Sequence, residues 1–211
     1  IKFDINLEPV KYFNETEVNY YKEKYLFVCG STHPGEEEIL IDSFIDLKKE
    51  NKHLVLAPRH PERFDEIKKI VNEKNLSNIL YTEVSSNPNI KSDVTIVDVM
   101  GRLLDFYQIA DCVFIGGTLV DHGGQNFLEP AIFNKPIISG RSTYNFDEIS
   151  KKLSDLGLLK FVSNKDEISS IVENIEAISD SQREETNLWL NENRGASEFI
   201  SKKVCKEFNL I

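Results

Sequence analysis

Two closely spaced glycine pairs, at 116–117 and 123–124, separate a strand-like apolar run at 111–115 from a predicted short helix that begins near Leu128. Glycine lets the backbone turn tightly and approach a ligand, because no Cβ stands in the way. The first N–H groups of a helix have no partner inside it, so they favour a bound phosphate. Glu129 follows at once, and its carboxylate can accept hydrogen bonds from the two vicinal hydroxyls of a ribose. The stretch therefore predicts a nucleotide pocket.

A tight strand–helix turn without a ligand is the plainer interpretation of these glycines, and for a single pair it is the favoured one. Two pairs followed by Asn126 and Glu129 favour the nucleotide pocket instead. Pro130 fits the first turn of the helix, where its missing N–H costs nothing.

Three further strand-like runs are also followed by residues that suit a ligand. Ser31 comes after the first run, where it is either part of an ordinary helix cap, with Glu36 favouring the helix dipole, or a donor to an anion. Arg59 comes after the second run, and a guanidinium group suits phosphate or carboxylate. Gly101 comes after the fourth run, where the backbone can reach a base edge or a ribose.

Alternating strand-like and helix-like segments must position these residues. Apolar runs without polar alternation indicate strands that are covered on both faces. The expected strands are 25–29, 53–57, 78–82, 94–99, 111–115, a run at 135–140 and 159–162, and the expected helices are 36–49, 62–74, 102–110, a short one near 128, 146–156, 165–178 and most of 181–208. This order predicts an α/β fold, a parallel sheet with helices on both faces.

Ligands of such sheets bind at the carboxyl ends of the strands. The unusual turns at 30–35, 58–61, 100–102 and 116–126 all fall at such ends. We therefore expect the four turns to meet in one site.

Composition limits the classes of function. The 211 residues are 40% hydrophobic and 28% charged, an ordinary balance for a globular protein with a core. The formal net charge of −10 argues against a nucleic-acid binder, which needs a basic face. Cys29, Cys112 and Cys205 are far apart and the histidines are scattered, so no metal site is expected. No apolar run is long enough to span a membrane.

Three segments are expected along the chain. Residues 1–22 have no clear period and are expected to form an interdomain linker or arm. Residues 23–192 are expected to form the nucleotide-binding domain, and residues 193–211 a helical extension. The chain starts at Ile1 rather than at Met, and we expect it to be a soluble fragment of a longer protein.

Several sequence blocks resemble one family, the 3-deoxy-D-manno-octulosonic acid (Kdo) transferases of lipopolysaccharide synthesis. The blocks are Lys2-Phe3-Asp4, STHPGEEE at 31–38, LAPRHPERF at 56–64, the stretch at 97–131 that contains the glycine pairs, the stretch around Tyr144-Asn145-Phe146, and Asn193-Arg194-Gly195-Ala196. They span nearly the whole chain. Arg102 stands where the family usually has an acid, and Gln125 where it often has histidine, so both departures bear on contacts with the donor.

The resemblance implies the C-terminal domain of a GT-B glycosyltransferase, a Rossmann-like domain that binds CMP-Kdo. It implies inverting transfer to a lipid A precursor at the cytoplasmic face of the bacterial inner membrane, with neither a metal ion nor a cofactor. The family's catalytic base and membrane anchor lie in an N-terminal half, so this chain alone is expected to bind the donor without transferring the sugar. The expected donor-site residues are Ser31, Pro58, Arg59, Met100, Gly101, Arg102, Gly117, Gly124, Asn126, Phe127, Leu128 and Glu129.

Two other functions stay open on the sequence alone. The first is the donor domain of another GT-B glycosyltransferase, or of a sugar-nucleotide epimerase, that uses a UDP-sugar. A preference for UDP over CMP ligands would favour it. The second is a non-catalytic module that binds a nucleotide or a partner, and tight ligand binding without activity of the full-length protein would favour it.

Overall fold

A seven-stranded, wholly parallel sheet forms the centre of the computed structural model, which describes residues 2–4, 13–195, 199 and 203. The strand order is β3-β4-β2-β1-β5-β6-β7. The strands are β1 (Tyr25–Thr32), β2 (Lys52–Pro58), β3 (Asn78–Leu80), β4 (Val94–Ile96), β5 (Cys112–Ile115), β6 (Ile137–Ser139) and β7 (Leu159–Phe161). The predicted parallel α/β fold is confirmed.

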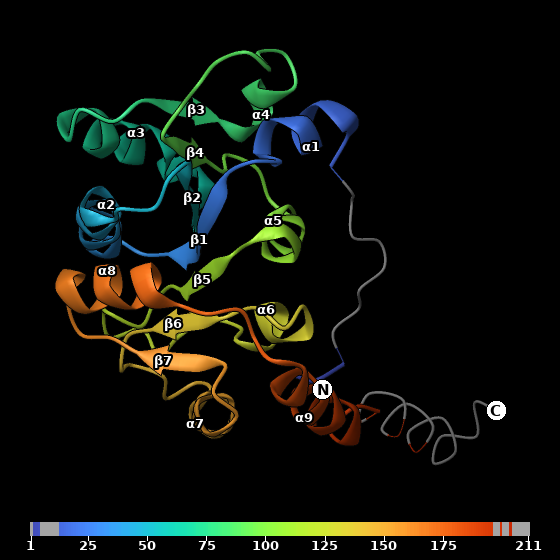
Figure 1. The fold of residues 1–211 in the computed structure, drawn as a ribbon. Helices are drawn as coiled ribbons and strands as arrows, with labels where there is room; N and C mark the ends of the chain where they lie inside the picture. The colour runs from blue at the N-terminus through green and yellow to red at the C-terminus, as the bar shows by residue number, and fades with distance from the viewer. Residues whose placement is uncertain (1, 5–12, 196–198, 200–202, 204–211) are drawn as a thin grey trace.

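Helices cover both faces of this sheet (Figure 1). On one face lie α2 (Glu36–Asp46), α3 (Phe64–Glu73) and α8 (Lys165–Asn174). On the other lie α1 (Glu15–Tyr21), α5 (Leu103–Ile109), α6 (Leu128–Ile132) and α9 (Asp180–Glu192), while α7 (Asp147–Asp155) lies beside β7. The short helix α4 (Tyr81–Val84) follows β3, and a 3-10 turn (Pro61–Arg63) precedes α3. None of the described helices is long and apolar enough to cross a membrane.

Side chains of each central strand alternate between two hydrophobic clusters. Along β1, Leu26 and Val28 join the cluster beneath α5 and α6, whereas Phe27 and Cys29 join the cluster beneath α2, α3 and α8. All four side chains are buried. Burial on both faces explains why the sequence of this strand shows no polar alternation.

The main departure from the sequence-based prediction is α1, which lies in the segment expected to be a linker or arm. Asn14 and Glu17 cap its start reciprocally: Asn14 Oδ1 accepts from the Glu17 N–H at 3.0 Å, and Glu17 Oε2 accepts from the Asn14 N–H at 2.9 Å. Tyr20 and Tyr21 are buried on the sheet side. A helix of seven residues is too short to show a period, so capping and packing determine it.

Smaller departures concern the ends of elements. β3, β4 and α8 stop earlier than expected, at Leu80, Ile96 and Asn174. The helix α9 confirms the helical prediction for the first part of the tail. Residues 5–12 of the expected linker and most of the expected extension at 193–211, Cys205 included, lie outside the described residues.

The order of the strands reverses between β1 and β5, because the chain runs from β1 to β2 on one side and from β5 to β6 and β7 on the other. In open α/β sheets, ligands bind in the crevice at such a point, outside the carboxyl ends of the strands. The turns that follow β1 and β5 meet there, and the Gly116 N–H donates to Gly30 O at 2.8 Å.

Candidate functional site

A pocket of about 250 Å³ opens at the carboxyl ends of β1, β2 and β4. Its lining residues come from several separate chain segments: Ser31, Ala57, Pro58, Arg59, Pro61, Val97, Val99, Met100, Gly101, Leu103, Leu104 and Glu129. Apolar side chains form much of the wall, with Arg59 and Glu129 as its charged groups. An apolar cavity with a few convergent polar groups is typical of a small-molecule site.

The pocket brings together many of the residues that the sequence analysis proposed. Those that line it are Ser31, Pro58, Arg59, Met100, Gly101 and Glu129. The turns at 30–35, 58–61 and 100–102 converge as expected, whereas no residue of the turn at 116–126 lines the pocket, which takes Glu129 from α6. In the described part of the chain, no group of three or more His, Cys, Asp or Glu residues could hold a metal ion.

Glu129 lies in the first turn of α6 and is held in place by Asn126. Asn126 Nδ2 donates to Glu129 Oε1 at 3.1 Å, and Asn126 Oδ1 accepts from the Leu128 N–H at 3.1 Å. Burial raises the pKa of Glu129 above its ordinary value, while the Asn126 hydrogen bond and the Arg59 charge act in the opposite direction. An oriented carboxylate of this kind can accept hydrogen bonds from both hydroxyls of a vicinal diol.

The backbone at Ser31 forms a bulge at the end of β1. Its φ of 55° lies in the left-handed region, which is uncommon outside glycine, and the pairing of β1 with β2 shifts between Gly30 and Thr32. Gly116 packs directly on this bulge, because an added Cβ would lie 2.2 Å from Ser31 O. Glycine at 116 is therefore required by close packing against the strand that carries Ser31.

The glycine-rich turn binds an anion that belongs to the protein itself. Glu36 is fully buried at the start of α2, and its carboxylate accepts from the N–H of Gly117 at 2.7 Å and from those of Thr118 and Leu119 at 3.0 Å. It also accepts from the His33 N–H at 2.9 Å. The amide of Gly117, which was expected to face a ligand, is thus engaged internally. From the sequence, Glu36 is expected only to favour the helix dipole, so its role as the acceptor of these N–H groups is a feature that the sequence-based prediction missed.

Other expected donor-site residues lie outside the pocket lining and support it from behind. Phe127 and Leu128 are fully buried in the core. Gly124 donates its N–H to Gly117 O at 2.9 Å and so closes the glycine-rich turn on itself. Asn126 reaches the pocket only through the carboxylate of Glu129.

Arg102 belongs to a separate cluster that joins α1 to α5. Its guanidinium group pairs with Asp105 at 2.9 Å and with Glu17 at 3.6 Å. The group also lies 5.3 Å from the ring centre of Phe13 and 5.1 Å from that of Tyr81. The resemblance leads one to expect an acid at position 102. The cation found there, Arg102, instead anchors the N-terminal helix α1.

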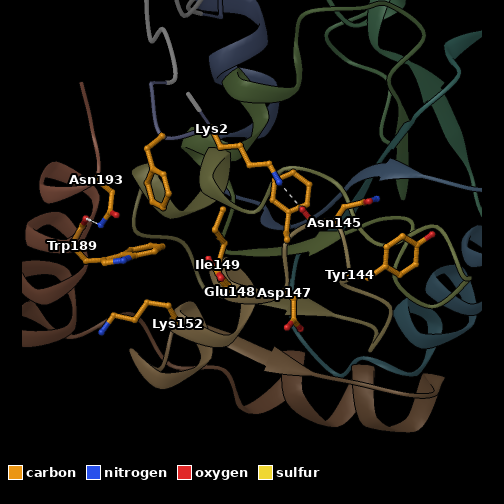
Figure 2. Close-up of a pocket in the computed structure, with 11 residues that line it drawn as sticks. Lys2, Tyr144, Asn145, Asp147, Glu148, Ile149, Lys152, Trp189 and Asn193 are labelled. Carbon is orange, nitrogen blue, oxygen red and sulfur yellow. Dashed lines mark hydrogen bonds between the residues drawn. The ribbon is translucent and has the colours of Figure 1, made fainter. Parts of the chain in front are cut away.

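A second cavity, of about 580 Å³, lies between the N-terminal residues, α7 and α9 and shares no lining residue with the strand-end pocket (Figure 2). Lys2 Nζ donates to Asn145 O at 2.6 Å and lies 4.2 Å from the ring centre of Phe146. The rings of Phe3 and Trp189 meet edge to face, 5.2 Å apart. Here Lys2 binds the segment that precedes α7 and Phe3 packs on α9, so these contacts hold the N-terminal residues against the domain.

Known proteins resemble this chain over much of its length, although no family model matches it. All of the chain aligns at 37% identity with a bifunctional glycosyltransferase/methyltransferase of Fusobacterium nucleatum, of which it spans 32%. Over 93% of its length it is 35% identical to the 3-deoxy-D-manno-octulosonic acid transferase of Haemophilus influenzae, of which it spans 48%. The chain thus spans half or less of the length of these curated relatives.

A solved structure shows the same architecture. The C-terminal CMP-Kdo binding domain of WaaA from Acinetobacter baumannii matches with a TM-score of 0.68 at 26% identity, over 80% of this chain and 88% of that one. Solved glycosyltransferases of much lower sequence identity share the fold. The fold is therefore that of a Rossmann-like domain of GT-B glycosyltransferases.

Proposed function

This chain belongs to the Kdo transferase family, and on that premise we propose that it binds CMP-Kdo as the donor half of an inverting, metal-independent glycosyltransferase. The observation that carries the proposal is the meeting of Arg59, the turn at Met100 and Gly101, and Glu129 in one pocket on the carboxyl edge of the sheet. Two turns and the start of α6, far apart in the sequence, supply a cation, an exposed backbone and a carboxylate to the same small volume.

These groups fit the parts of a nucleoside monophosphate. The apolar wall, which includes Val97 and Leu104, suits a flat base, and the backbone at Gly101 is open to a base edge. Glu129 is oriented to accept the ribose hydroxyls. The exposed guanidinium group of Arg59 suits the phosphate and would stabilise the negative charge of the departing nucleotide without a metal ion.

The acceptor site and the catalytic base belong, in this proposal, to another part of a full-length protein. We propose that the acceptor is a lipid A precursor and that the full-length protein works at the inner membrane. Inverting transfer needs a base beside the attacking hydroxyl. The 211 residues alone are therefore expected to bind the donor and to transfer no sugar, a result that a transfer assay with and without the remaining half would check.

Calorimetric titration of the chain with CMP, UMP, UDP and ADP tests the choice of donor. We expect CMP to bind most tightly and to raise the melting temperature, because a ligand that binds only the folded state stabilises it. Binding of UDP without binding of CMP would overturn the proposal and favour a UDP-sugar enzyme. Tight CMP binding by a full-length protein that transfers no sugar would favour a non-catalytic module.

Substitution of Arg59 tests whether its shape or only its charge is used. Both Arg59→Ala and Arg59→Lys are expected to weaken CMP binding about tenfold, because a lysine ammonium lacks the planar fork of donors. Arg141→Ala serves as the control, since Arg141 is an exposed arginine outside the pocket lining. Near-native CMP affinity of Arg59→Lys would contradict bidentate binding of the phosphate.

A further inference from the structure

Two imidazole rings stack on each other at the point where the strand order reverses. The ring centres of His33 and His122 are 4.5 Å apart and the ring planes differ by 29°. Both histidine side chains lie against Gly117, whose φ is 70°. A Cβ at this position would lie 3.3 Å from His122 Cβ and 3.3 Å from His33 Cε1. Glycine at 117 therefore combines a left-handed backbone with room for the stack.

The hydrogen bonds of His33 define which of its ring nitrogens is used. Nδ1 lies 3.0 Å from Ser31 O, and a carbonyl oxygen only accepts, so Nδ1 carries the proton. Burial lowers the pKa of His33, against the opposing effect of Glu36, so the ring is neutral near pH 7 and Nε2 is an acceptor. Within the described part of the chain, Nε2 of His33 and both ring nitrogens of His122 have no hydrogen-bond partner.

The stack adjoins the strand-end pocket. Ser31 lines that pocket, and the carbonyl oxygen of the same residue holds His33. From the other side Asn145 fixes His122, because Asn145 Nδ2 donates to His122 O at 2.9 Å and the Asn145 N–H donates to Gly123 O at 3.0 Å. A group attached to a nucleotide in the pocket would therefore meet two imidazoles whose backbones are fixed.

The backbone amides beneath the two stacked imidazoles are not available to bind a sugar. Glu36 already accepts from the N–H of Gly117, Thr118 and Leu119. The polar groups of a sugar at this place must therefore bind to side chains, and the imidazoles are side chains with unused polar atoms.

We propose that His33 and His122 form the subsite for the sugar of the donor, a polyhydroxylated sugar acid. Nε2 of His33 accepts a hydrogen bond from a sugar hydroxyl, and a ring N–H of His122 donates to a sugar oxygen. This inference rests on the proposed function, because it places the sugar beside a nucleotide in the strand-end pocket.

Calorimetry with CMP and with freshly prepared CMP-Kdo, in the absence of acceptor, tests the subsite. The variants are His122→Ala, His33→Gln and the control Lys69→Ala, an exposed residue of α3 outside the pocket lining. We expect His122→Ala and His33→Gln to weaken CMP-Kdo binding about tenfold and to leave CMP binding within about twofold. The control should leave both affinities unchanged. Thermal melting of each variant verifies that it is folded.

The outcomes separate the two levels of inference. If the wild-type chain binds neither CMP nor CMP-Kdo, the proposed function fails and the subsite fails with it. If CMP binds and both His variants bind CMP-Kdo as tightly as the wild type, the subsite alone is overturned. Equal losses for CMP and CMP-Kdo in His122→Ala, a substitution at an exposed residue, would place the histidines at the nucleotide and overturn the sugar assignment.

Discussion

Two histidines at opposite ends of neighbouring strands show how the two edges of the sheet differ. His53 lies near the start of β2 and is 1% exposed, with Nδ1 3.0 Å from Ser92 O and Nε2 2.8 Å from Thr95 Oγ1. Burial lowers its pKa to about 3, and the charge of Lys24 acts in the same direction. His33 follows the end of β1 and uses only one ring nitrogen within the described chain.

The two edges of the sheet show that neither a cavity nor a buried histidine is enough to mark a ligand-binding site. A cavity of about 640 Å³ opens beside His53 on the amino edge, but several of its polar groups already have partners within the protein. Lys24 Nζ lies 3.4 Å from the ring centre of Tyr20, and Lys52 Nζ donates to carbonyl oxygens near the end of α2, that of Phe44 at 2.7 Å among them. At the carboxyl edge, Nε2 of His33 and both ring nitrogens of His122 have no hydrogen-bond partner within the described chain, and such departures from a fully satisfied structure are expected where function lies.

The largest expected effect concerns Glu36, the carboxylate of the carboxyl edge that we expect to stabilise the fold, in contrast to Glu129, which we expect to bind the ligand. Glu36→Ala removes the acceptor of four N–H groups, two of them in buried hydrogen bonds, and is expected to lower the free energy of unfolding by about 3–6 kcal/mol. Glu38→Ala, at an exposed position of the same helical turn, is the control and should change it by less than about 0.5 kcal/mol. Urea denaturation measures both. Equal effects of the two substitutions would contradict the structural role of Glu36.

The second prediction concerns the amino edge and the pH dependence of stability. Unfolded His53 takes up a proton near pH 6.5, whereas the folded residue stays neutral down to about pH 3. Its contribution is therefore complete above pH 6.5 and is lost as the pH falls, by about 1.4 kcal/mol per unit below that value and about 2.7 kcal/mol by roughly pH 4.5. Urea denaturation between pH 7 and about pH 4.5 should show a shallower slope for His53→Gln.

An exposed residue beside the same cavity provides the control for that slope. Asn89→Ala is expected to leave the pH dependence of the wild type unchanged, because it removes no titratable group. If His53→Gln and the wild type lose stability in parallel, the amino edge is not a closed network around a neutral imidazole, and the comparison with His33 fails.

The third prediction concerns Glu129 as the carboxylate for the ligand. Glu129→Gln keeps the oxygen that accepts from Asn126 but loses the charge, so CMP affinity should fall about tenfold, or about 1.4 kcal/mol, with little change in stability. Because the pKa of Glu129 is raised, CMP affinity of the wild type should fall on acidification at a higher pH than an ordinary carboxyl group would give. The Gln variant should lack this pH dependence. Lost stability with unchanged CMP affinity would make Glu129 a second structural carboxylate.

The middle of the sheet could be predicted from the sequence because burial on both faces makes the strands mostly apolar. The runs at 25–29 and 53–57 lie within β1 and β2, and the run at 111–115 forms β5 from Cys112 onward. The helix α1 could not be predicted in the same way, because its seven residues are determined by a cap at Asn14 and by packing of the tyrosines that follow.

Part of the candidate site was predictable for a similar reason. Residues that directly follow parallel strands share one edge of the sheet, so Arg59 and Met100 had to lie near each other. The role of Glu36 was not predictable, because its partners in the glycine-rich turn lie 81 to 83 residues further along the chain. The position of Arg102 was not predictable either, since Glu17 belongs to the unforeseen helix.

The smallest expected effect concerns Gly101 on the wall of the pocket. Its φ is 80°, and an added Cβ would have no atom within 4 Å, so Gly101→Ala introduces backbone strain without a clash. The free energy of unfolding should fall by about 1 kcal/mol, because an alanine is disfavoured in the left-handed region.

Gly35→Ala is the matched control: its φ is 90° and the nearest atom, Val120 Cγ1, would be at 3.8 Å. Both variants should lose similar stability, but only Gly101→Ala should change the affinity for CMP, since Gly35 does not line the pocket. If the two variants bind CMP equally well, the open backbone at Gly101 does not contact the nucleotide, and the carboxyl edge loses one of the features that set it apart from the amino edge.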